Sequence, residues 1–167
     1  MSTVLEVAGR LGDQFPEIFL FVGEGADKEQ LISEAKKRGL SNVIFLPQQP
    51  REKVPSIIRA SDICLVLLRK ADVFKTVIPT KMLEFMACGR PVILGVDGQA
   101  RQVLERAQAG IFVRPEDPEE LSQAILHLYK DDNLRESLGG NGRTYILNHL
   151  SREQTAKDYL TLLKKFA

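Results

Sequence analysis

The sequence has no tryptophan, only two cysteines and only two histidines. Two cysteines are too few for a disulfide-stapled scaffold. Both Cys64 and Cys88 fall in apolar segments, which favours buried, reduced thiols over a disulfide or a metal role. Neither His127 nor His149 has a neighbour suited to share a metal ion. We therefore expect no metal and no cofactor.

Long apolar runs and a charge of one sign are also missing. No segment approaches the roughly 20 apolar residues that span a bilayer, and Met1–Glu6 lacks the basic start and apolar run of a secretion signal. The net charge of +1 gives no strong field to attract nucleic acid or an anionic membrane. With 44% hydrophobic and 27% charged residues, the composition is that of a soluble globular domain. We expect a cytoplasmic protein without a nucleic-acid partner.

Five short apolar runs indicate β-strands. They are rich in Val, Ile and Phe and do not alternate with polar residues, a pattern typical of strands buried on both faces of a parallel sheet. The runs are Glu17–Val22, Asn42–Leu46, Asp62–Leu68, Pro91–Leu94 and Gly110–Val113.

Helical patterns separate these runs, and several have readable ends. Asp27 and Gln30 form a capping-box-like pair, Gly39 ends the helix that follows them, and Asp117 caps another. Strand–helix alternation predicts a single α/β domain over residues 1–167, with a doubly wound, Rossmann-like parallel sheet and flanking helices. The expected helices are Val4–Gln14, the segment from Asp27 to Gly39, Arg51–Ala60, Pro79–Cys88, Gln99–Gln108, Pro118–Tyr129, Asn133–His149 and Arg152–Phe166.

The order of elements is unusual at the amino end, because a helix opens the chain with no strand before it. An α/β domain more often starts with a strand. We expect a truncated fragment that lacks the first strand of its sheet.

The segment Lys75–Val92 (KTVIPTKMLEFMACGRPV) carries the most chemistry. Its helix Pro79–Cys88 is mostly apolar, yet Thr80, Lys81 and Glu84 share one face. The free N–H groups and positive dipole of a first helical turn favour a phosphate, and Lys81 adds a full charge. Glu84 lies about 6 Å further along the axis, where a carboxylate can accept two hydrogen bonds from a ribose diol. A simple Lys81–Glu84 ion pair, worth about 0.2–0.5 kcal/mol, explains the same spacing.

Two loops after strands offer weaker signals. Gly23-Glu24-Gly25 lacks the third glycine of a dinucleotide fingerprint, since Lys28 stands in its place. This loop is either a tight turn that brings backbone near a ligand or a purely structural turn. The loop Leu46-Pro47-Gln48 could offer a backbone donor and acceptor to a base edge, or merely connect two elements.

The segments FVGEG, NVIFLP, ASDICLVLL, PTKMLEFMACGRPVI and AGIFVRPEDPEEL, in this order, resemble the C-terminal, donor-binding domain of family 4 retaining glycosyltransferases of the GT-B fold. The resemblance covers nearly the whole chain. The PTKxxE form is similar to enzymes of bacterial lipopolysaccharide and capsule synthesis. The resemblance to this family implies a nucleotide-sugar-binding domain, with a UDP-sugar as the expected donor and no obligatory metal.

The resemblance also implies a role for each matching position. Glu84 holds the ribose hydroxyls, and the loop Leu46, Pro47, Gln48 meets the base through its main chain. The remaining positions are the diphosphate-binding residues Thr80, Lys81, Met82 and Lys75, and the residues near the donor sugar, Gly23, Glu24, Gly25, Thr76 and Ile78.

Two departures from the family pattern limit what the resemblance implies. Thr76 stands where the family has a glutamate that touches the donor sugar, so the sugar is left open. The strand with its basic pair and the acceptor-binding N-terminal domain are missing, so we expect the fragment to be inactive. The lost strand is central in the family, and a homo-oligomer or a strand swap could cover its gap.

The full protein is expected to transfer a sugar to an acceptor, such as a lipid-linked glycan at the inner membrane face. The main alternative is a non-catalytic nucleotide-binding or interaction module of Rossmann-like fold. An epimerase of the same architecture is disfavoured because the acid/base set it requires is not found. A nicotinamide-dependent oxidoreductase is disfavoured by Lys28.

Overall fold

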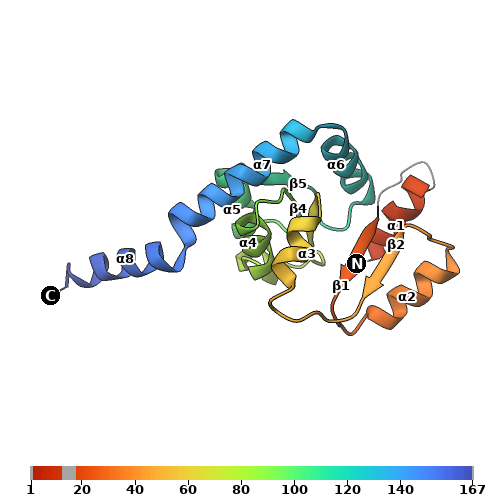
Figure 1. Cartoon of the computed structure of the whole chain (residues 1–167), viewed down its shortest axis with the longest axis horizontal. Helices are drawn as coiled ribbons and strands as arrows, with labels where there is room; N and C mark the ends of the chain where they lie inside the picture. Colours follow the sequence, from red (N-terminus) through yellow and green to blue (C-terminus); the bar gives the residue numbers. More distant parts are fainter. Residues whose placement is uncertain (1, 13–17, 167) are drawn as a thin grey trace.

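The computed structural model describes residues 2–12 and 18–166 (Figure 1). Helices and parallel strands alternate along the chain, which confirms the predicted α/β class. The elements are α1 (Ser2–Leu11), β1 (Phe19–Val22), α2 (Lys28–Lys37), β2 (Val43–Leu46), α3 (Val54–Ala60), β3 (Cys64–Leu67), η2 (Asp72–Thr76), α4 (Thr80–Ala87), β4 (Val92–Gly95), α5 (Gln99–Ala107), β5 (Gly110–Phe112), α6 (Pro118–Lys130), α7 (Asp132–Tyr145), the π-helical η3 (Ile146–Leu150) and α8 (Arg152–Leu163).

The strands form two separate sheets. β1 pairs with β2 in parallel, and β3, β4 and β5 form a second parallel sheet in that order. Asp27, shortly after β1, lies 3.5 Å from Arg69, shortly after β3, so the carboxyl ends of both sheets share one side. The expected interruption of the sheet therefore lies between β1 and β3.

Burial of the strands differs from the prediction. Among the described strands, only β4 is buried along its whole length, with a strand on each side and helices packed on both faces. In the other sheet Leu20, Val22 and Ile44 are exposed. They project from the face opposite Phe19 and Phe21, which pack into the core with α1 and α2. The prediction of strands buried on both faces was wrong for β1 and β2, whereas β3 and β5 are buried or half-buried throughout.

Most predicted helix ends are confirmed. Gly39 ends α2 with φ +66°, and the Asp117 carboxylate accepts hydrogen bonds from the N–H groups of Glu119 and Glu120, both at 3.0 Å. The capping box at α2 was wrong. The Asp27 side chain makes no capping hydrogen bond and instead faces Arg69.

Helix α1 joins the two sheets across one face of the interruption. Its residues Val4, Val7 and Ala8 share a buried cluster with Phe19 of β1 and Ile93 of β4. Helix α6 completes this cluster, whereas α4 and α5 cover the three-stranded sheet from the other face and α7 packs against both clusters. Helix α1 thus covers the interruption on one face.

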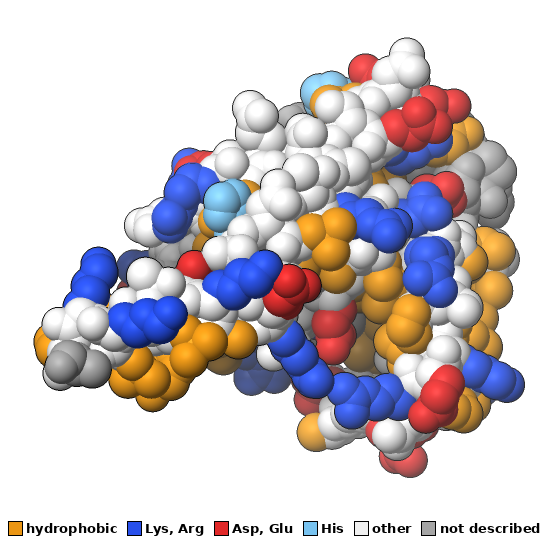
Figure 2. Space-filling model, turned by 60° about the vertical axis from the view of Figure 1, so that its left-hand side comes forward, with side chains coloured by type: hydrophobic (Ala, Val, Ile, Leu, Met, Phe, Trp, Pro, Cys, Tyr) orange, Lys and Arg blue, Asp and Glu red, His pale blue; other side chains and the backbone are white. Residues whose placement is uncertain are grey.

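The carboxyl-terminal helix α8 extends away from the body of the protein (Figure 1). Its exposed apolar residues include Tyr159, Leu160 and Leu163, and hydrophobic side chains gather along the underside of this arm in Figure 2. No helix in the described part of the chain has the length and apolar character to cross a bilayer.

Candidate functional site

Helix α4 places two charged side chains in a large cleft. Pro79 occupies the N-cap position, one residue before the helix, and Gly89 ends it with φ +73°. Met82 and Met86 are fully buried in the core, so the remaining face carries Lys81 and Glu84 outward. Both line a cleft of about 1820 Å³, together with α3, β1, β3 and the loop after β1.

Neither charged side chain has a partner among the described residues. The Glu84 carboxylate is exposed and makes no ion pair or hydrogen bond, and Lys81 makes none with it. Burial alone lowers the pKa of the Lys81 ammonium. The alternative of a simple Lys81–Glu84 ion pair is therefore wrong in this structure.

The first turn of α4 offers fewer backbone donors than the sequence implied. The Met82 N–H already donates to the Pro79 carbonyl oxygen at 2.9 Å, and the Met82 side chain is buried. The first-turn N–H groups left without a helical acceptor are those of Thr80 and Lys81.

Two loops that form the opposite wall are tied to each other. Glu24 accepts hydrogen bonds from the Lys28 ammonium at 2.7 Å and from the Gln48 N–H at 3.4 Å. The hydrogen bond from Lys28 is the main cause that lowers the pKa of the Glu24 carboxyl. The Leu46 carbonyl accepts from Gly23 N–H at 3.2 Å and from Lys28 at 3.5 Å.

These contacts bear on the predicted base-binding loop. Two backbone groups of this loop, the Leu46 carbonyl and the Gln48 N–H, are occupied by internal partners. Gln48 lines the cleft, as do Gly23, Glu24 and Gly25, whereas Pro47 lies outside its wall. The Glu24–Lys28 link was missed, although its i, i+4 spacing is visible in the sequence.

The structure does not bring the residues of η2 to Lys81 and Glu84. Lys75 pairs with Asp72 at 2.7 Å, and this hydrogen bond raises the pKa of its ammonium. The Thr76 hydroxyl donates to the Val73 carbonyl at 3.2 Å. Lys75, Thr76 and Ile78 are all exposed and lie outside the cleft wall.

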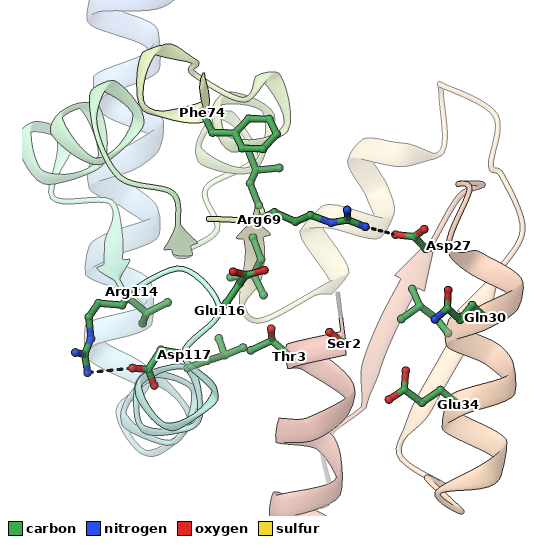
Figure 3. Close-up of a pocket in the computed structure, with 15 residues that line it drawn as sticks. Ser2, Thr3, Asp27, Gln30, Glu34, Arg69, Phe74, Arg114, Glu116 and Asp117 are labelled. Atoms are coloured by element: carbon green, nitrogen blue, oxygen red, sulfur yellow. Dashed lines mark ion pairs between the residues drawn. The ribbon is translucent and has the colours of Figure 1, made fainter. Parts of the chain in front are cut away.

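A smaller cavity of about 400 Å³ lies at the carboxyl ends of the strands (Figure 3). Arg69 reaches from the end of β3 towards Asp27, and Arg114 pairs with Asp117 at 3.0 Å on another wall. The sequence reasoning missed Arg69. Its position directly after a predicted strand is the signal that would have pointed to it, since ligands of parallel sheets bind beyond strand carboxyl ends.

No group of three or more His, Cys, Asp or Glu side chains within residues 2–12 and 18–166 is arranged to hold a metal ion. The large cleft and the smaller cavity share Asp27, Leu31, Leu67 and Leu68 on their walls. Parallel α/β domains bind their ligands beyond the carboxyl ends of the strands, where both of these spaces lie.

The chain belongs to the family of glycosyl transferases, group 1, which it matches over residues 1–145. It is 26% identical over 148 residues to the uncharacterized glycosyltransferase MJ1069 of Methanocaldococcus jannaschii, covering 89% of this chain and 37% of the relative. It is 30% identical over 128 residues to the putative colanic acid biosynthesis glycosyl transferase WcaI of Escherichia coli, covering 75% of this chain and 31% of the relative. The chain thus spans about a third of the length of these relatives.

Solved structures show the same fold. Anabaena Alr3699/HepE in complex with UDP-glucose superposes with a TM-score of 0.81 at 18% identity, covering 99% of this chain and 45% of that one. The C-terminal domain of LpcC, a glycosyl transferase group 1 family protein from Francisella tularensis, gives a TM-score of 0.71 at 21% identity. The match covers 90% of this chain and 78% of that one. The predicted resemblance to the C-terminal half of a GT-B glycosyltransferase is confirmed.

Proposed function

We propose that this chain binds the nucleoside-diphosphate-sugar donor of a retaining glycosyltransferase, and that the donor is a UDP-sugar. The observation that carries the proposal is the pair of unpartnered charges on α4. Lys81 and Glu84 face one cleft without pairing with each other or with any other described residue.

The chemistry of a nucleoside diphosphate fits this pair. A half-buried ammonium without a counter-ion is unfavourable, and a diphosphate beside Lys81 would replace the lost hydration. The N–H groups of Thr80 and Lys81 add donors at the positive end of α4. Glu84, one turn further on, accepts the two ribose hydroxyls.

The same groups favour the transition state of glycosyl transfer. As the glycosidic bond to the diphosphate breaks, negative charge grows on the leaving phosphate oxygens and positive charge on the sugar. Lys81 and the helix end interact more strongly with the leaving group than with the intact donor, so they lower the barrier.

Relatives and neighbours support the donor class. Anabaena Alr3699/HepE was solved with UDP and with UDP-glucose, and TarM of S. aureus was solved with UDP. The names of WcaI and of WaaG refer to colanic acid and lipopolysaccharide biosynthesis. We place the full protein in the synthesis of a cell-surface polysaccharide or lipopolysaccharide, acting on a lipid-linked glycan together with an acceptor-binding domain.

The loops around the cleft take the remaining roles in this proposal. The main chain of Leu46–Gln48 meets the base once Glu24 and Lys28 release its polar groups, and Gly23–Gly25 lies near the donor. Lys75, Thr76 and Ile78 directly precede α4 in the chain and lie outside the cleft wall, and we assign them to the diphosphate and the sugar at the start of α4.

A calorimetric screen of UDP, GDP, ADP, NAD and UDP-sugars against the chain tests the proposal. We expect UDP to bind more tightly than NAD and to compete with every UDP-sugar that binds. A preference for NAD, or no binding of any nucleotide, would refute it.

A further inference from the structure

A carboxylate acceptor and a backbone donor lie next to each other beyond the carboxyl ends of β1 and β2. Val22 pairs with Leu46 at the end of this parallel ladder. Glu24 and Gln48 each follow two residues later, and the Gln48 N–H donates to Glu24 Oε1 at 3.4 Å. Both residues line the large cleft, so a ligand in the cleft meets the two groups together.

The Glu24 carboxylate is charged, held in place and still accessible. The Lys28 ammonium donates to Oε1 at 2.7 Å and lowers the pKa of the carboxyl, so this group is ionised at neutral pH. Among the described residues, none donates to the second oxygen, Oε2. The side chain is 58% exposed, so a ligand can reach it from the cleft.

The loop after β2 has fewer free acceptors of its own. The Leu46 carbonyl accepts two hydrogen bonds from the segment after β1, and the Pro47 carbonyl accepts one from the Gln49 side-chain amide at 3.0 Å. Pro47 has no N–H, so Gln48 carries the first backbone donor after Leu46. Its 3.4 Å hydrogen bond to Glu24 is longer than the usual range of about 2.7–3.2 Å, so a ligand oxygen can replace this acceptor.

A donor beside an acceptor distinguishes between nucleotide bases. Uracil presents a keto oxygen next to a ring N–H, whereas cytosine presents an amino group next to a ring nitrogen that only accepts. A backbone N–H beside a carboxylate complements the edge of uracil. Against cytosine, the same pair sets donor against donor and acceptor against acceptor. The two bases have the same size, so the hydrogen-bond pattern alone separates them.

We propose that Glu24 is a specificity-determining residue for the base, whose carboxylate accepts the ring N–H of uracil while the Gln48 N–H donates to the adjacent keto oxygen. This inference rests on the proposed function, which assigns the base to Leu46–Gln48 and the ribose to Glu84 of the same cleft. The site then favours uridine donors over cytidine donors, because a polar group of the site left facing a like group is costly. Lys28 is the positioning residue that holds the carboxylate.

Titration calorimetry of UDP and CDP against the chain and its Glu24→Gln variant tests the proposal. We expect the unaltered chain to bind UDP at least about tenfold more tightly than CDP. A glutamine can turn either its oxygen or its amino group towards the ring nitrogen. The preference in Glu24→Gln should therefore fall below about threefold. A thermal melt checks that the variant folds.

Two further variants serve as controls. Glu29→Gln removes the same charge from an exposed residue at the start of α2 that lies outside the cleft wall. It should keep the full preference for UDP. Glu84→Gln should weaken UDP and CDP by the same factor, because the ribose is common to both nucleotides.

The possible failures are distinguishable. Equal binding of UDP and CDP to the unaltered chain would overturn the role of Glu24. So would a preference for UDP that survives Glu24→Gln, because the acceptor would then be a backbone carbonyl, and the donor site itself would stand. If no nucleotide binds the unaltered chain, the proposed function is refuted together with this inference.

Discussion

Replacing Glu84 with glutamine removes the charge that we assign to ribose binding while keeping the shape of the side chain. The Glu84 carboxylate is exposed and has no partner among the described residues, so Glu84→Gln breaks no internal contact. We expect the free energy of unfolding to change by less than about 0.5 kcal/mol. UDP affinity should fall by about 1–3 kcal/mol, the range for weakening a hydrogen bond to a charged group, which is about 5- to 150-fold in Kd.

Titration calorimetry with UDP measures this change, and a thermal melt of each variant checks its folding. Glu136→Gln is the matched control, because Glu136 is also an exposed glutamate on a helix but lies outside the cleft wall. The control should bind UDP like the unaltered chain. If Glu84→Gln binds UDP with unchanged affinity, the carboxylate does not hold the ribose and the donor site is wrong as drawn.

Burial lowers the pKa of the Lys81 ammonium in the folded chain below its ordinary value of 10.5. Between these two pKa values the unfolded chain binds more protons than the folded chain, so the free energy of unfolding rises with pH. Lys81→Met should therefore raise the melting temperature at pH 7, by a margin that shrinks as the pH approaches 10.5, while calorimetry shows UDP binding weakened far more than uridine binding. Gly139→Ala should destabilise the fold by about 2 kcal/mol or more in urea melts, because the added Cβ would lie 2.2 Å from a backbone carbonyl oxygen. Gly140→Ala, which meets nothing within 4 Å, should stabilise α7 by about 0.5–1 kcal/mol. Burial raises the pKa of Cys64 to about 12, so a thiol reagent at neutral pH should label Cys88 in the folded chain and Cys64 only after unfolding.

The sequence predicted the elements well because the chain has strong local signals. Gly39 and Gly89 end helices in the left-handed region that favours glycine, and Asp117 caps α6 as its position before Pro118 indicates. The failures have a tertiary cause. Asp27 makes no cap because its carboxylate faces Arg69, a residue from the other sheet that no local pattern could place beside it.

The sequence predicted the candidate site only where its residues are close together in the chain. Lys81 and Glu84 lie on one helix, so their shared face follows from their spacing. The backbone groups of Leu46 and Gln48 are occupied by Glu24 of the neighbouring loop after β1 and by Lys28 at the start of α2, which the separate loop patterns did not reveal. Lys75 pairs with Asp72 in η2 at i, i+3 spacing, a contact that the sequence allows but that the expected diphosphate role did not include.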